Sequence, residues 1–212
     1  MSEISKPNRK ELTHDKIVGA AARSIRTAGC DGVGVAEIMK QAGLTHGGFY
    51  AHFDSRDAML AEALLRAGQE SAAAMRESVI ALQSSGVSAF RALVETYLSD
   101  RHIASPDGCC VVAVLLSELP RQSPAVRETS TLLIDGLLAA IRRVLPEQVD
   151  QNLAPMIASA MVGALQLARS LGDTPEGRKH LFATRTALIA EYDVPATAAK
   201  VTHERREALS KH

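Results

Sequence analysis

The sequence has no tryptophan, and aromatic residues make up only 3% of its 212 positions, whereas hydrophobic residues make up 46%. Its core must therefore be built from small and aliphatic side chains, which is compatible with an alanine- and leucine-rich helical protein. No apolar run approaches the roughly 20 residues that a membrane-spanning helix needs, and the first residues are polar rather than a signal-peptide core. We therefore expect a cytoplasmic protein that does not enter a membrane.

The usual motifs of catalysis and cofactor binding are also missing. The sequence contains no G-x-S-x-G nucleophile elbow, no phosphate-binding P-loop and no dinucleotide fingerprint. Its three cysteines lack zinc-finger spacing, and His203-Glu204 lacks the second histidine of a zinc-binding helix. We predict that the protein is not an enzyme and that it holds neither a metal nor a cofactor.

An excess of positive charge is absent as well, because 24 lysines and arginines balance 24 aspartates and glutamates. This argues against a protein whose whole surface coats nucleic acid. The distribution is uneven, however, since residues 6–26 carry six basic side chains against the two acidic ones Glu11 and Asp15. The basic residues are Lys6, Arg9, Lys10, Lys16, Arg23 and Arg26. This basic arm either neutralises DNA phosphates or is a solvated tail.

Residues 17–53 carry the most informative pattern. Apolar residues over 17–28 follow helical spacing, and Gly29 then ends this helix because glycine accepts the left-handed conformation of a C-cap. A second short helix over 35–41 follows, and Ala42-Gly43-Leu44 turns the chain again. Thr45 is positioned to cap a third helix with its hydroxyl. Two helices joined by a tight glycine turn, with a bracing helix before them, indicate a helix-turn-helix.

The reading segment, which we define as residues 45–53, has an unusual composition. Gly47 and Gly48 each cost roughly 1 kcal/mol relative to alanine inside a helix, so a purely structural helix should avoid them. Their missing Cβ atoms let the backbone approach a groove or a phosphate closely. Phe49 and Phe53 have the spacing to anchor the segment to the helices behind it.

The remaining side chains of the segment suit contact with DNA. Thr45 and His46 lie at its amino end, which usually meets base edges, and Tyr50 and His52 offer polar tips to phosphate oxygens. An ordinary surface turn between two helices is the alternative for this segment.

Residues 14–66 resemble the DNA-binding domain of TetR-type transcriptional regulators. The resemblance rests on Ile17, Ala21-Ala22, Gly29, Val35-Ala36-Glu37-Ile38, Ala42-Gly43-Leu44-Thr45, Gly48-Phe49-Tyr50-Ala51-His52-Phe53, Arg56 and Leu60. It implies a homodimer, usually a repressor, that a small molecule releases from its double-stranded DNA operator. The resemblance implies that Thr45, His46 and Gly47 face bases, that Tyr50 and His52 hold phosphates and that Arg56 contacts the backbone. Gly48 is a further residue expected at the DNA. Gly34 departs from the family, which usually has serine or threonine at that position.

The fold that we predict is all-α. It has a three-helix helix-turn-helix domain at residues 1–54, a helical regulatory and dimerisation domain at 55–192 and a polar tail at 193–212. The helices expected in the second domain span residues 55 to about 82, 88–103, 109–119, 125–145, 150–171 and 175–192.

The last two helices of this domain suggest a dimer contact. The helix over 150–171 has an apolar face rich in small residues, which permits close approach of another helix. The face either pairs two subunits or packs within one. The candidate interface residues are Ile157, Met161, Ala164, Leu165, Phe182 and Ile189.

The same domain should hold the ligand, in a mostly apolar pocket between its earlier helices. Candidate lining residues are Met75, Phe90, Tyr97, His102, Cys109, Leu116 and Leu133. A ligand that prefers a conformer with wrongly spaced reading segments would release the DNA.

Two other functions stay open at this point. Cys109 and Cys110 lie at an expected helix amino terminus, where the helix dipole favours a reactive thiolate, so a thiol switch could replace the small-molecule ligand. They cannot form an ordinary disulfide with each other, because adjacent Cα atoms are too close. The other alternative is a helical interaction protein that does not bind DNA.

Overall fold

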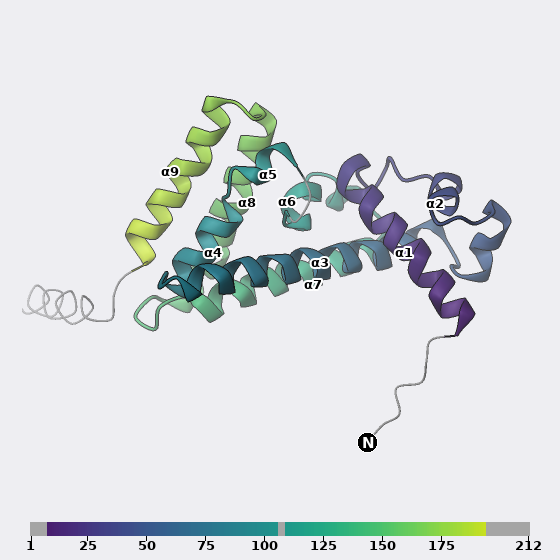
Figure 1. Ribbon diagram of the computed structural model, residues 1–212, viewed down its shortest axis with the longest axis horizontal. Coiled ribbons are helices and arrows are strands. Elements are labelled where there is room, and N and C mark those ends of the chain that lie inside the picture. The colour runs from purple at the N-terminus through teal and green to yellow at the C-terminus, as the bar shows by residue number, and fades with distance from the viewer. Residues whose placement is uncertain (1–7, 106–108, 194–212) are drawn as a thin grey trace, which may run out of the picture. The chain divides into compact units, whose positions relative to one another are not determined.

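The structure is a computed structural model that describes residues 8–105 and 109–193. These described residues form helices without any strand, as the sequence predicts. The α-helices are α1 (Arg9–Ala28), α2 (Val35–Gln41), α3 (Arg56–Ser84), α4 (Ala89–Tyr97), α5 (Arg101–Ala104), α6 (Val111–Leu115), α7 (Pro124–Val144), α8 (Ala154–Leu171) and α9 (Pro175–Tyr192) (Figure 1). The 3₁₀ helices are η1 (His46–Ala51), η2 (Leu119–Arg121) and η3 (Gln151–Leu153). No described helix is both long and apolar enough to cross a membrane.

The chain divides into two compact units. The first unit comprises Met1–Ala72 and Cys110–Ile134, and the second comprises Ala73–Cys109 and Asp135–His212. The predicted helix-turn-helix domain, residues 1–54, falls inside the first unit, which also takes in the beginning of α3 and the segment from α6 to the middle of α7. The predicted tail lies outside the described residues from position 194 onward.

Helix α1 begins earlier than the apolar spacing suggests, at Arg9 rather than near Ile17. Asn8 and Glu11 form a capping box, in which the Asn8 side chain accepts from the Glu11 N–H and the Glu11 carboxylate accepts from the Asn8 N–H. This satisfies two backbone donors that a helix end otherwise leaves open. Residues 9–16 of the basic arm are therefore helical, and Lys6 lies outside the described residues.

The core of the first unit depends on small side chains in α1. Ala20, Ala21 and Ala22 are all fully buried, and they let α2 and α6 pack close to the α1 backbone. The larger members of this core come from α1 itself and from the helices around it. They include Ile17 and Ile25 of α1, Ile38 and Met39 of α2, Met59, Leu60 and Leu64 of α3, and Leu115 of α6. Each buried side chain of that size stabilises the fold by about 1.5–3 kcal/mol relative to exposure.

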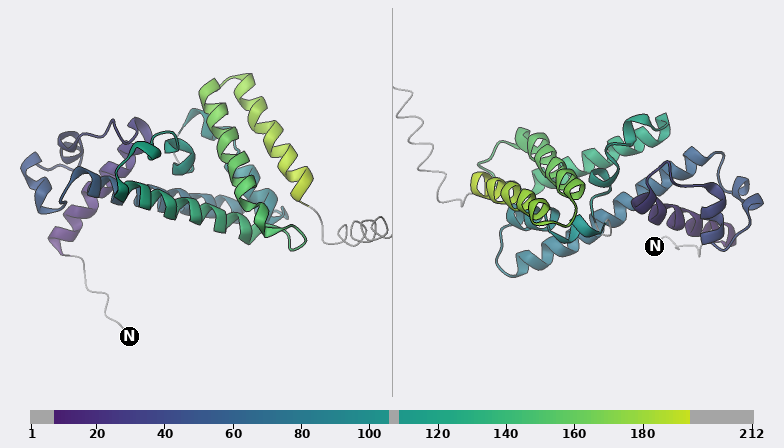
Figure 2. Two further views of the ribbon diagram at one scale, coloured as in Figure 1. Left: turned by 180° about the vertical axis from the view of Figure 1, so that it is seen from behind. Right: turned by 90° about the horizontal axis from the view of Figure 1, so that it is seen from above.

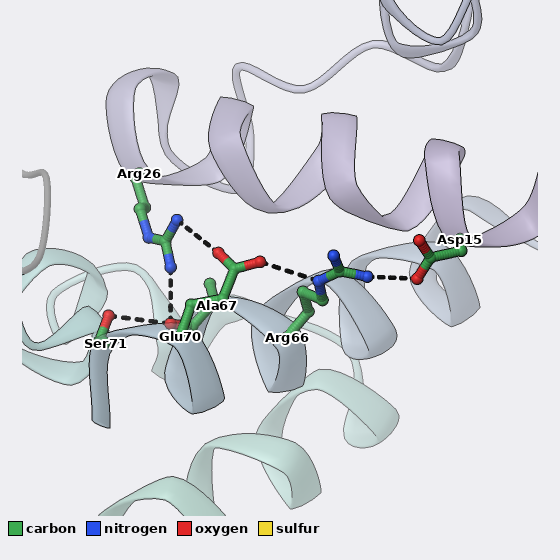
Figure 3. A network of polar contacts seen from close by, with 6 residues as sticks. All are labelled: Asp15, Arg26, Arg66, Ala67, Glu70 and Ser71. Carbon is green, nitrogen blue, oxygen red and sulfur yellow. Dashed lines mark hydrogen bonds and ion pairs between the residues drawn. The ribbon is translucent and has the colours of Figure 1, made fainter. Parts of the chain in front are cut away.

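A network of polar contacts joins α1 to α3 (Figure 3). Arg26 donates to the Glu70 carboxylate at 3.0 Å and to the Ala67 carbonyl at 2.8 Å, and Arg66 bridges Glu70 and Asp15. Burial raises the pKa of Glu70, but the hydrogen bonds from Arg66 and Arg26 outweigh it and hold this pKa below its usual value. Arg26, counted in the sequence as part of a DNA-binding arm, is thus engaged inside the unit.

In the second unit, α8 and α9 lie side by side in Figure 1 and in the left view of Figure 2, and α4 packs against α9. The predicted helix over 88–103 is divided into α4 and α5. In an uninterrupted helix the Tyr97 carbonyl would accept from residue 101. It accepts instead from His102 Nδ1 at 3.1 Å, while His102 Nε2 accepts from Arg101 Nε at 3.2 Å. Both ring nitrogens of the buried His102 are therefore used within the unit.

Burial lowers the pKa of His102 more than the Tyr97 hydrogen bond raises it. Below about pH 6.5 this histidine is protonated in the unfolded chain but stays neutral in the folded protein. The free energy of unfolding should therefore decrease as the pH falls from about 6.5 to the lowered pKa of His102. We predict a flatter pH dependence for His102→Asn, whose amide can still donate to the Tyr97 carbonyl. Urea unfolding of both proteins from pH 5 to 8 measures the difference, and parallel profiles would contradict this role.

Candidate DNA-binding surface

The predicted third helix is present in the reading segment as the 3₁₀ helix η1, which covers residues 46–51. The six residues of η1 include Gly47 and Gly48, which are poor helix formers. Short helical segments commonly adopt the tighter 3₁₀ form. Thr45 is extended and precedes η1, but its hydroxyl makes no capping hydrogen bond, so the expected cap is wrong. Thr45 is exposed.

Phe49 and Phe53 hold this short element in place. Their side chains are 1% and 3% exposed, and their rings stack with centroids 5.4 Å apart. The His14 ring of α1 stacks on Phe53 at 4.5 Å. The predicted anchoring of the segment by two phenylalanines is confirmed, and His14 is a third member that sequence spacing alone did not reveal.

The polar side chains of the segment face outward. Thr45, His46 and Gly47 are exposed, and Tyr50 is 73% exposed with its ring edge-on to Phe49. A tyrosine this exposed contributes little to the core. The turn that buries Phe49 leaves Tyr50 in solvent. The structure therefore gathers these predicted DNA contacts on one short, anchored element.

The fold itself does not require glycine at positions 47 and 48. Neither residue has a positive φ, so neither needs the conformational freedom of glycine. A Cβ at Gly47 would meet nothing within 4 Å, and one at Gly48 would make an ordinary 3.6 Å contact with Met39. Helix propensity disfavours both glycines, and neither backbone conformation nor internal packing accounts for them.

His52 follows η1 and is partly buried. Burial, His14 and Lys10 all lower its pKa, which favours a neutral imidazole. Its buried Nδ1 has no hydrogen-bond partner among the described residues. An unused ring nitrogen of this kind can serve an incoming group.

Arg56 makes contacts within the first unit that the sequence did not predict. It donates from Nε to the Val33 carbonyl at 3.0 Å and from Nη2 to the Cys30 carbonyl at 2.5 Å, and both acceptors belong to the loop between α1 and α2. A guanidinium can satisfy two carbonyls at once because its donors form a fixed fork. Arg56 uses these two donors to hold the loop that positions α2, and the expected contact with the DNA backbone stays a prediction.

Glu118, which sequence reasoning did not single out, holds the same loop from the other side. Its carboxylate accepts from the Cys30 N–H at 2.7 Å. It also lies where a Cβ at Gly29 would be, within 2.5–2.9 Å, and Gly29 has a φ of +74°. Glycine at position 29 therefore has two roles. It adopts the positive φ that ends α1, and it leaves room for the Glu118 carboxylate. Because 88 residues separate the partners, no local pattern could have indicated it.

The structure gives little support to a thiol switch. Burial, with Glu118 and Asp31, raises the pKa of Cys30 to about 11, so this thiol stays protonated at neutral pH. Cys109 is fully buried. Helix α6 begins only after Cys110 and has five residues, fewer than the expected helix over 109–119. Asp107-Gly108 lies outside the described residues.

The predicted ligand-lining residues are divided between the two units. Phe90, Tyr97, His102 and Cys109 are buried in the second unit, where Met75 is half-buried, whereas Leu116 and Leu133 belong to the first unit. Leu133 covers Gly68 so closely that a Cβ there would lie 2.3 Å from it. Among the described residues, one groove lies on the first unit and another on the second, and none of these side chains lines either of the two.

The residues expected at a dimer interface mostly face inward. Ile157, Met161 and Leu165 are fully buried within the second unit, and Ala164 is 6% exposed. Phe182 is 58% exposed, and Ile189 is half-buried. The face of α8 that points outward is another stripe at helical spacing. It consists of Met156, Ala160, Gly163, Leu167 and Leu171.

Residues 17–63 match the model of the tetR family of bacterial regulatory proteins. This match covers the stretch from the middle of α1 to the first turns of α3, so this part of the chain is similar to the amino-terminal part of those regulators. No curated protein matches the sequence.

Solved structures resemble most of the chain. A TetR transcriptional regulator from Chloroflexus aurantiacus is 24% identical with a TM-score of 0.68, over 86% of this chain and 96% of that one. The reduced form of Escherichia coli NemR is 20% identical with a TM-score of 0.69, over 87% and 99%. The multidrug binding protein EbrR, complexed with imidazole, is 22% identical with a TM-score of 0.64, over 91% and 99%. At these identities the likeness establishes the fold, which is that of TetR-type regulators.

The role found for Arg56 leads to a prediction about stability. Arg56→Ala leaves two loop carbonyls without their charged donor, so the free energy of unfolding should fall by roughly 1–3 kcal/mol. Arg127→Ala, which removes an exposed arginine from α7, serves as the control and should change it little. Denaturant unfolding at constant salt measures both, and equal stabilities for the two variants would contradict the role of Arg56 in holding the loop.

Proposed function

We propose that the protein is a homodimeric, sequence-specific DNA-binding repressor that a small molecule releases from its operator. The observation that carries the proposal is the reading segment. It is anchored by two buried phenylalanines, exposes Thr45, His46 and Tyr50, and contains a glycine at position 47 that internal packing does not need. A segment of this kind is suited to entering a major groove, with Thr45 to Gly48 near base edges and Tyr50 and His52 at phosphates.

A second copy of the chain is the proposed partner. One reading segment covers few base pairs, and a dimer doubles the contact while fixing the spacing of two half-sites. Support comes from the outward stripe of α8 and from Phe182 of α9, because large exposed apolar side chains in such an arrangement mark association surfaces. Gly163, in the middle of that stripe, has open space where a Cβ would lie, so a partner helix can come close there.

The proposed release signal is a small molecule bound by the helical second unit. The likeness to EbrR, which is named a multidrug binding protein, supports this choice. A ligand that binds one conformer better than another shifts the equilibrium by its differential affinity, and DNA affinity falls by the same free energy. Because its partner is chromosomal DNA, we place the site of action in the cytoplasm, and repression follows where the operator overlaps a promoter.

Selection of duplexes from a random DNA pool tests the proposal, because the pool itself reveals any sequence that the protein prefers. We expect a pair of related half-sites to be enriched, in keeping with a two-fold dimer. Gly47→Ala should bind the selected duplex about tenfold or more weakly, since a Cβ obstructs the groove, yet be as stable as the parent or more so. Tyr50→Ala should also bind more weakly.

Gly136→Ala is the matched control, because it also adds a Cβ into open space on a helix but lies on α7 in the second unit. It should raise stability in the same way and leave DNA affinity unchanged. Absence of any enriched sequence, or full affinity in both Gly47→Ala and Tyr50→Ala, would contradict the proposal.

The dimer face gives a separate prediction. Leu167→Glu places a charge in the proposed apolar contact, so the protein should sediment as one chain while keeping its helical circular dichroism. Leu132→Glu is the control, because Leu132 is equally open, 63% exposed against 56%, but lies on α7 in the first unit. If Leu167→Glu still sediments as two chains, the proposed face is wrong.

A further inference from the structure

A groove of about 630 Å³ lies on the second unit, where α9 meets α4 and the end of α3. Its volume is within the range of about 300–1,000 Å³ that is typical of small-molecule sites. None of the described residues that line it belongs to α8, so the groove is distinct from the outward stripe of α8 proposed for the dimer. No role assigned above uses its charged residues.

One wall of the groove is apolar. Phe182 of α9 is 58% exposed, and it borders the groove together with Leu82 of α3 and Ile189 of α9. Three apolar side chains from two helices thus face one hollow, and an aromatic ring this open presents a surface on which another ring can pack. This wall suits the apolar body of a small molecule.

Arg185 of α9 supplies positive charge beside that wall. Its side chain is half-buried, and its guanidinium carbon lies 5.6 Å from the centroid of the Phe182 ring. Arg185 donates from Nη1 to the Leu98 carbonyl at 3.3 Å, and its other donors bond to nothing else among the described residues. No described carboxylate forms an ion pair with it. A half-buried cation of this kind favours an anion that comes from outside.

The other charges of the groove are already paired. Arg91 donates from Nε to the Glu95 carboxylate at 2.7 Å along α4. Asp193 lies near Arg91 and accepts from the Ser88 hydroxyl. An anion beside Arg185 therefore meets no unpaired carboxylate among the described lining residues, and the exposed Thr186 offers a hydroxyl as a further donor.

We propose that this groove binds a small molecule that carries a carboxylate on an aromatic body. The carboxylate accepts from the Arg185 guanidinium, whose fork of donors matches its two oxygens, and the body packs against Phe182 and Ile189. This names a ligand class and a place for the small molecule of the proposed function. It rests on that function only for the effect of the ligand on DNA.

The test measures the binding of indole-3-acetate and of its neutral counterpart, indole-3-acetamide, to the full-length protein without DNA. Because the sequence contains no tryptophan, the fluorescence of the indole ring reports binding of the probe directly. We expect indole-3-acetate to bind with a Kd below about 1 mM and about tenfold or more tightly than the amide, since only the carboxylate forms charged hydrogen bonds with Arg185.

Two variants assign the contacts. Arg185→Gln keeps an N–H donor but loses the charge, so it should bind indole-3-acetate about tenfold or more weakly and the amide as well as the parent does. Phe182→Ala should weaken the binding of both probes, because both lose the ring beneath them. Arg178→Gln is the control, since Arg178 is also on α9 but pairs with Asp173 and does not line the groove. It should bind both probes like the parent.

Equal binding of the two probes by the parent, or no binding of either, would overturn the proposal. Full affinity for indole-3-acetate in an Arg185→Gln variant with parental circular dichroism would overturn it as well, because the carboxylate would then lie elsewhere. If the probes bind as expected but the protein selects no DNA sequence, the proposed function fails while this site stands, so the two failures are distinguishable.

Discussion

The reading segment has too few apolar side chains to fold by itself, and the whole first unit is arranged around that constraint. A six-residue 3₁₀ helix with two glycines buries only Phe49 of its own, so its position depends on the stack of Phe49, Phe53 and His14. Truncating a buried phenylalanine typically costs about 3–5 kcal/mol. Here, truncation would also remove the support that holds Tyr50 and His46 at the surface. Packing and the proposed DNA contact therefore depend on the same rings.

Polar contacts then fix the elements that form this seat. Arg56 and Glu118 both hold the loop between α1 and α2. Arg56 donates to two loop carbonyls, and Glu118 accepts from a loop N–H. The Arg26–Glu70–Arg66–Asp15 network holds α1 on α3. Removing one member of a part-buried pair leaves the other uncompensated, which usually costs more than the pair contributes. Rigid support of this kind suits a surface that must be preformed before it meets a DNA groove.

Sequence periodicity and glycine placement predicted the helices of the first unit and the residues on its outer edge, because those features are local. They failed where a tertiary contact decides. Arg56 is spaced like a DNA contact but turns toward loop carbonyls, and Glu118 acts 88 residues from its partner. On α8, composition indicates an apolar helix but does not distinguish its two apolar stripes. The stripe with Ile157 and Met161 packs within the chain, and the stripe with Leu167 is exposed. The division of the helix over 88–103 was missed because a histidine ring replaces one backbone hydrogen bond.

The central claim is that the segment from Thr45 to Phe53 is the part of the protein that meets DNA. A crystal structure of the full-length protein on its selected duplex tests this most directly. The account predicts η1 in the major groove, with Gly47 facing a base edge, Tyr50 and His52 at phosphates, and Arg56 still bound to the Cys30 and Val33 carbonyls. A complex in which the duplex contacts another surface and leaves η1 in solvent would contradict it.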